Sequence, residues 1–107
     1  MADKNTSILA YYMSLAQKGG ARDVDLIMRG LNDNMTFAES RFIDYSLGLV
    51  KSDEGSERIG WYLFNGTQIQ KNYSTLFFNR RCEKGDWEKV KKAYRMGLID
   101  ATQAFSK

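Results

Sequence analysis

The spacing of apolar residues in the first 51 positions constrains the fold more than any other feature of the chain. Between Asp23 and Leu31, apolar residues recur at i, i+3, i+4 and i+7, which places them on one face of an α-helix. A similar pattern runs from Ser7 to Gly19, and a third follows Thr36, which forms a T-x-x-E capping box with Glu39. This half of the chain is therefore predicted to form three helices.

The segments on either side of Asn65-Gly66 carry the clearest strand signal in the chain. Residues 59–64 and 67–70 are rich in aromatic, β-branched and amide side chains, and Asn-Gly readily adopts the positive φ angles of a type I′ turn. We therefore expect a β-hairpin here. Residues 73–81 fit the period of a third strand and the period of a helix equally well, and period alone does not decide between them for so short a run.

A helix beginning at Asp86 and ending at Gly97, and a short helical turn beginning at Asp100, complete the expected elements. The predicted fold class is thus α+β: a mainly helical single domain of four to five helices, with a small antiparallel β-hairpin or three-stranded meander around residues 59–79. A length of 107 residues permits one small core. Within it we expect an acidic helical half, 1–51, a charged glycine-bearing loop, 52–58, and a basic hairpin-plus-helix half, 59–107.

Composition argues against catalysis. The chain has no histidine and one cysteine, so a Cys-His nucleophile pair is impossible and a zinc site of Cys and His lacks its ligands. It also lacks G-x-G-x-x-G and G-x-x-x-x-G-K-[ST], the loops that cradle phosphates in nucleotide enzymes. We therefore expect no enzyme activity, no catalytic residues, no metal and no cofactor.

Charge is distributed unevenly. Residues 1–58 carry seven basic and nine acidic side chains, whereas residues 59–107 carry nine basic and four acidic ones. Basic side chains bind phosphates and exposed aromatic rings stack on bases, so the sequence predicts a small regulatory or accessory protein that contacts nucleic acid or a nucleic-acid-bound protein. A solvated helix face is the plainer alternative. The predicted contacts are Arg80, Arg81, Lys84, Lys89, Lys91, Lys92 and Arg95.

A second hypothesis is a protein-interaction module, an inhibitor or adaptor of the kind that mobile elements carry. Trp61 and Leu63 alternate with Tyr62 and Phe64, so both faces of the predicted strand are apolar and one of them needs cover from a helix or a partner. The predicted interaction aromatics are Trp61, Tyr62 and Phe64.

No membrane segment is expected. The longest apolar run near the start, 8–15, has eight residues, far fewer than the roughly 18 that span a bilayer, and it lacks the flanks of a signal peptide. With the lone Cys82, these features predict a protein of the reducing cytoplasm.

Overall fold

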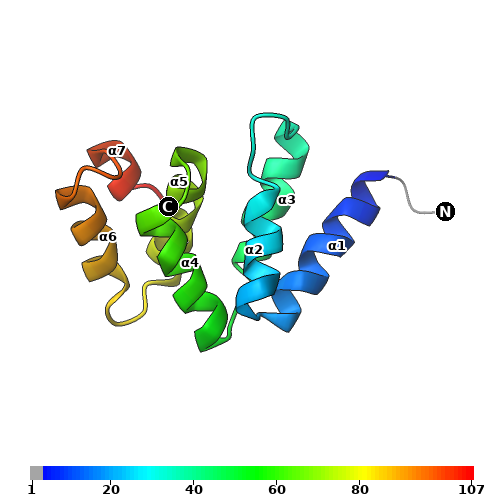
Figure 1. Ribbon diagram of the computed structural model, residues 1–107, viewed down its shortest axis with the longest axis horizontal. Coiled ribbons are helices and arrows are strands. Elements are labelled where there is room, and N and C mark those ends of the chain that lie inside the picture. Colours follow the sequence, from blue (N-terminus) through cyan, green and yellow to red (C-terminus); the bar gives the residue numbers. More distant parts are fainter. Residues whose placement is uncertain (1–3) are drawn as a thin grey trace. The chain divides into compact units, whose positions relative to one another are not determined.

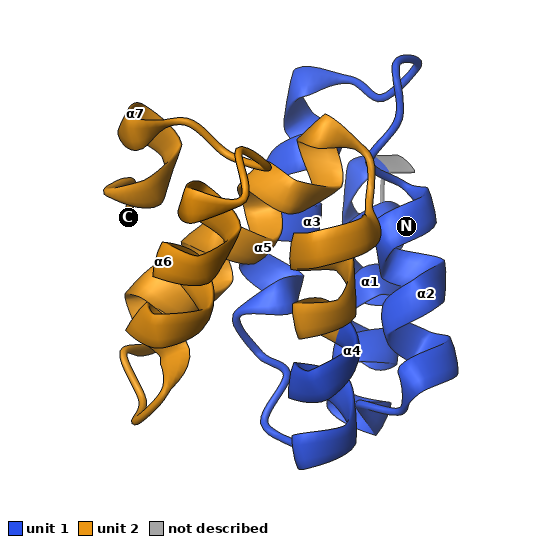
Figure 2. Ribbon diagram, turned by 60° about the vertical axis from the view of Figure 1, so that its left-hand side comes forward, with its two compact units in different colours: residues 1–58 blue, residues 59–107 orange. Residues whose placement is uncertain are grey.

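The computed structural model describes residues 4–107, and this part of the chain forms seven helices (Figure 1). In chain order they are α1 (Lys4–Lys18), α2 (Ala21–Arg29), α3 (Phe37–Leu47), α4 (Asp53–Asn65), α5 (Gln68–Arg81), α6 (Asp86–Arg95) and α7 (Ala101–Ala104). The three helices predicted before residue 51 and the two predicted near the end of the chain are confirmed as α1, α2, α3, α6 and α7. The contacts divide the chain into two compact units, one ending at Arg58 and one beginning at Ile59 (Figure 2).

The prediction of an α+β fold is wrong, because residues 4–107 contain no strand. The expected hairpin or meander at 59–79 is part of α4 and α5. The Asn65 side-chain amide donates to the Trp61 carbonyl at 3.0 Å, and the Gly66 N–H donates to the Tyr62 carbonyl at 2.9 Å. The Asn-Gly pair thus closes the last turn of a helix.

A capping box starts the next helix directly after this pair. Thr67 Oγ1 accepts from the Gln70 N–H at 3.2 Å, and Gln70 Oε1 accepts from the Thr67 N–H at 2.9 Å. These bonds satisfy two backbone donors that a helix start leaves unpaired. The segment 73–81, for which sequence left helix and strand open, is accordingly the second half of α5.

The predicted loop at 52–58 is also helical, from Asp53 onward. Ser52 Oγ accepts from the Gly55 N–H at 3.0 Å and so caps α4, and the first turn of α4 carries two carboxylates that favour the positive end of the helix dipole. One of them, Glu54, accepts from the Ala21 N–H at 2.6 Å and thereby also caps α2. A segment without apolar residues is helical here because its polar groups cap helix ends.

Glycine at position 55 permits a close approach. A Cβ atom there would lie 2.7 Å from the carbonyl oxygen of Gly19 and 2.6 Å from a methyl carbon of Val50. Gly19, with φ +67°, ends α1 in the left-handed conformation that favours glycine. The first turn of α4 therefore packs directly on the backbone of the α1–α2 connection.

In the N-terminal unit, α1 packs against α2 and α3. An ion pair between Arg58 Nε and Asp25 Oδ1, 2.6 Å long, joins α4 to α2. The buried apolar side chains of this unit are Leu15, Ala16, Val24, Ile27, Met28, Leu31, Ile43, Leu47 and Val50.

In the C-terminal unit, α5 packs against α6 and α7, and α6 packs against α7. From α4 this unit buries Ile59 and Leu63, which are four residues apart and so lie on one helix face. The other buried apolar side chains of the unit are Phe77, Phe78, Val90, Ala93, Ile99 and Ala104. Among residues 4–107, no helix combines the length and the apolar character needed to cross a membrane.

Candidate functional site

The seven predicted cations lie on two helices of the C-terminal unit and the connection between them. Arg80 and Arg81 end α5, Lys84 lies in the α5–α6 connection, and the remaining four are in α6. Their side chains differ in accessibility: Arg80, Lys84, Lys92 and Arg95 are exposed, whereas Arg81, Lys89 and Lys91 are half-buried. The seven cations therefore differ in how accessible they are to a ligand.

Arg81 has a structural role. Its Nε donates to Asp86 Oδ2 at 2.9 Å and its Nη2 donates to Asp86 Oδ1 at 2.7 Å, and the Asp86 side chain is only 1% exposed. Burial alone would raise the pKa of Asp86, but the hydrogen bonds from Arg81 and from the Glu83 N–H, with the charges of Arg81 and Lys89, hold that pKa below its ordinary value. Arg81 neutralises a buried carboxylate, which limits its use for a phosphate.

Three of the lysines also have partners. Lys89 Nζ lies 5.0 Å from the centroid of the Phe78 ring, and Lys92 Nζ lies 5.6 Å from the centroid of Phe64. Lys91 Nζ pairs with Glu88 at 3.2 Å on the helix surface, an exposed pair of small energetic weight. Within residues 4–107, neither Lys92 nor Arg95 forms an ion pair with a carboxylate.

An exposed aromatic pair lies beside these cations. The rings of Trp87 and Phe105 are in contact, with centroids 5.5 Å apart and planes inclined by 39°, although the two residues are 40% and 70% exposed. Together with Lys91, Tyr94, Arg95 and Ala104 they line a shallow cavity of about 210 Å³, which we call the Lys91 hollow. Here the structure brings two predicted cations next to three exposed aromatic rings.

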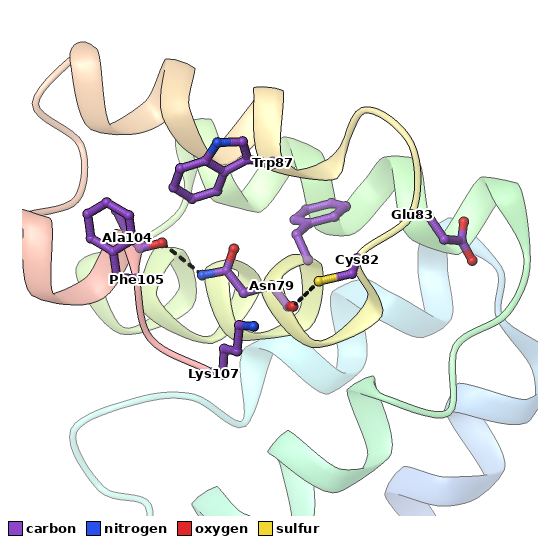
Figure 3. Close-up of a pocket in the computed structure, with 8 residues that line it drawn as sticks. Asn79, Cys82, Glu83, Trp87, Ala104, Phe105 and Lys107 are labelled. Atoms are coloured by element: carbon purple, nitrogen blue, oxygen red, sulfur yellow. Dashed lines mark hydrogen bonds between the residues drawn. The ribbon is translucent and has the colours of Figure 1, made fainter.

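The same aromatic pair also borders a second cavity, of about 320 Å³ (Figure 3). We call it the Asn79 pocket; its lining is Phe78, Asn79, Cys82, Glu83, Trp87, Ala104, Phe105 and Lys107. Asn79 Nδ2 donates to the Ala104 carbonyl at 2.9 Å and to the Ser106 carbonyl at 2.7 Å, which ties the C-terminal segment to α5. The Cys82 thiol donates to the Asn79 backbone carbonyl at 2.7 Å.

The predicted interaction aromatics belong to α4 and not to a strand. Trp61 is 44% exposed and meets Tyr62 edge to face, with ring centroids 5.0 Å apart, and Phe64 is half-buried beneath Lys92. Leu63, whose place on the second face of the strand motivated the protein-interaction hypothesis, is fully buried. The prediction of a two-faced apolar strand is wrong, because helical spacing puts Ile59 and Leu63 together in the core.

Sequence reasoning missed Asn79, Phe105 and Lys107. Phe105 follows a helix of only four residues, and no local pattern marks it as the partner of Trp87, 18 positions earlier. Asn79 lies in a segment whose secondary structure the sequence left open. A prediction of α5 as a helix would have placed Asn79 and Cys82, three positions apart, on the same side of it.

Comparisons with protein-family models, with curated proteins and with solved structures found no match. Within the described residues, no three or more Cys, Asp or Glu side chains are grouped so that they could hold a metal ion. The site is therefore characterised by its aromatic rings, its cations and one buried carboxamide.

Proposed function

We propose that this chain is a non-enzymatic module that binds single-stranded nucleic acid through the C-terminal unit. The observation that carries the proposal is the exposed Trp87/Phe105 pair, which borders a hollow lined by Lys91 and Arg95. Single-stranded nucleic acid is held by such combinations, in which cations follow the phosphates and aromatic rings stack on unpaired bases.

Unpaired bases suit this surface better than a duplex does. A duplex keeps its base faces stacked inside, whereas a single strand offers them to protein rings, and each stacked base contributes about 1–3 kcal/mol. Trp87, Tyr94 and Phe105 are all at least 40% exposed, so their rings are accessible to bases.

The charge of the unit supports the same proposal. Residues 59–107 carry nine basic and four acidic side chains, a net charge of +5, whereas residues 1–58 carry a net charge of −2. A positive potential confined to one part of a chain attracts a polyanion to that part and speeds its association. Cys82 is a free thiol, which fits the reducing cytoplasm in which we propose that the protein works.

A matched pair of triple variants tests the proposal. One replaces Lys91, Lys92 and Arg95 by Gln; the control replaces three exposed cations of the N-terminal unit, Lys18, Arg22 and Lys51, by Gln. Arg81 is left in place because it neutralises Asp86.

Affinity for fluorescein-labelled 12-nucleotide oligouridylate and oligothymidylate is measured by anisotropy at low salt. We expect the first variant to bind at least tenfold more weakly and the control to stay within about twofold of the wild type. Equal losses in both variants would show that affinity depends on the net charge of the protein and not on these three cations, which would contradict the proposal. Absence of binding by the wild type would also refute it.

A further inference from the structure

We infer that the Asn79 pocket receives one unpaired nucleobase and recognises an N–H group on its edge. This inference rests on the proposed function, and it adds a base-reading element to a surface that otherwise binds through charge and stacking. The evidence is the shape of the pocket, the fixed orientation of the Asn79 carboxamide and the charges around the opening.

The walls of the pocket suit a flat, apolar-faced ring. Trp87 and Phe105 provide the accessible apolar surface, with the buried Phe78 and Ala104 behind it. The volume of about 320 Å³ lies at the lower end of the range of ~300–1,000 Å³ typical of small-molecule sites. The Trp87 and Phe105 ring centroids are 5.5 Å apart, which leaves no room for a third ring between them. A base in this pocket therefore stacks against Trp87 from the pocket side.

The orientation of the Asn79 amide is fixed by its neighbours. Asn79 is only 7% exposed, and its Nδ2 donates to two backbone carbonyls, those of Ala104 and Ser106. Carbonyl groups only accept hydrogen bonds, so the amide nitrogen must face them and the amide oxygen must face the other way. Figure 3 shows that oxygen directed toward Trp87.

The Asn79 oxygen accepts no hydrogen bond from residues 4–107. Asn79 Oδ1 is not one of the fully buried side-chain atoms that lack a partner, so it is open to the pocket, and a ligand N–H can bond to it in place of water. The pocket thus favours a flat ring with an N–H on its edge. Uracil and thymine carry such a group at N3, guanine at N1, and adenine and cytosine on their exocyclic amines.

The surroundings favour a base that is attached to phosphate. Lys107 and the acidic Glu83 both line the pocket itself. The excess of positive charge therefore comes from Lys91 and Arg95, which line the neighbouring hollow that shares Trp87 and Phe105 with the pocket. A strand that places one base in the Asn79 pocket therefore finds cations next to its flanking phosphates. A free, uncharged aromatic molecule would make no use of these charges.

Base methylation tests this inference without altering the pocket. Twelve-nucleotide oligouridylate is compared with oligo-3-methyluridylate, and oligoadenylate with oligo-N6,N6-dimethyladenylate, each as RNA and as the corresponding DNA. Methylation removes the N–H donor but keeps the ring and the phosphates. The protein carries Trp61→Phe, which leaves Trp87 as its only tryptophan, so quenching of the remaining fluorescence reports stacking on Trp87, while anisotropy of labelled oligonucleotides reports binding anywhere.

We expect the unmodified member of at least one pair to quench Trp87, and its methylated counterpart to bind about tenfold more weakly. Equal affinity and equal quenching within both pairs would overturn the inference but leave the proposed function standing, whereas binding without quenching of Trp87 would overturn both, because the proposed function also relies on stacking against Trp87. Absence of any anisotropy change with all the oligonucleotides would overturn both. A preference for the RNA or the DNA series shows whether the sugar contributes.

Discussion

Arg81 and Asp86 form a bidentate ion pair. Arg81 Nε lies 2.9 Å from Asp86 Oδ2, and Arg81 Nη2 lies 2.7 Å from Asp86 Oδ1. The carboxylate is 1% exposed and the guanidinium side chain is 20% exposed. The same Asp86 oxygen, Oδ2, also accepts from the Glu83 N–H at 2.9 Å. These bonds fix the α5–α6 connection, on which the position of Trp87 depends because Trp87 directly follows Asp86.

This pair predicts a dependence of stability on pH. The folded-state pKa of Asp86 is lowered, so its contribution to the free energy of unfolding is fully present above the unfolded-state pKa of about 3.9 and is lost as the pH falls through the folded-state value. Asp86→Asn should cost about 3 kcal/mol at pH 7, because Arg81 loses the buried carboxylate that accepts hydrogen bonds from its Nε and Nη2, and should flatten the loss of stability below pH 5.

Urea unfolding at pH 7, 5, 4 and 3 measures both effects. Asp33→Asn is the control, since Asp33 is exposed in the α2–α3 connection, and should change stability by less than about 0.5 kcal/mol. An Asp86→Asn protein within 1 kcal/mol of the wild type at pH 7 would show that the ion pair contributes little.

Two glycines of α4 predict opposite effects of the same substitution. Gly55→Ala places a Cβ atom 2.7 Å from the Gly19 carbonyl oxygen and should destabilise the protein by about 1–3 kcal/mol, the usual cost of overpacking. Gly60→Ala meets only the Phe78 ring at 3.6 Å, an ordinary contact, and should stabilise by about 0.5–1 kcal/mol through helix propensity. Thermal unfolding of both variants compares them directly; equal shifts of Tm would contradict the packing described for Gly55.

Capping by Thr67 is tested by Thr67→Ala. This change removes the Oγ1 acceptor of the Gln70 N–H and should cost about 1 kcal/mol in the free energy of unfolding. Thr67→Ser keeps the hydroxyl and should restore most of the loss. Were Thr67→Ala neutral in chemical denaturation, the capping box would not be what favours a helix over a hairpin after Gly66.

Helical periodicity and capping signals predicted five of the seven helices in residues 4–107, because apolar spacing and capping boxes such as Thr36 with Glu39 are local signals. The prediction failed at Asn65-Gly66 because the same two residues suit a hairpin turn and a helix end, and the T-x-x-Q box that follows carries the deciding information. It failed at 52–58 because those polar side chains cap helix ends, partly through contacts 33 residues away, such as Glu54 to Ala21.

The candidate site was predictable only in part. Charge counts indicated the C-terminal unit, but they could not distinguish Arg81, which is bound to a buried carboxylate, from the exposed Arg95. The Trp87/Phe105 contact and the orientation of the Asn79 amide depend on how α5, α6 and α7 pack, and no pattern within one segment encodes that packing.

The aromatic pair predicts a loss of affinity on substitution. Phe105→Ala removes one of its rings and should weaken binding of a 12-nucleotide single strand about tenfold, the equivalent of one stacked base. Phe37→Ala is the matched control, because Phe37 is 78% exposed and has Arg41 5.8 Å from its ring centroid but belongs to the acidic unit. Anisotropy titrations at constant salt measure both; a loss as large for Phe37→Ala would show that the binding surface lies elsewhere.

The salt dependence of single-strand binding tests the central claim most directly. Affinity for labelled 12-nucleotide oligouridylate is measured between about 50 and 200 mM salt, for the wild type and for the variant with Lys91, Lys92 and Arg95 replaced by Gln. The wild type should lose affinity linearly on a log–log plot, and the magnitude of the slope should fall by about 2 in the variant, as expected when three phosphate contacts are lost. Identical slopes for the two proteins, or affinity that does not depend on salt, would contradict the assignment of this surface to nucleic acid.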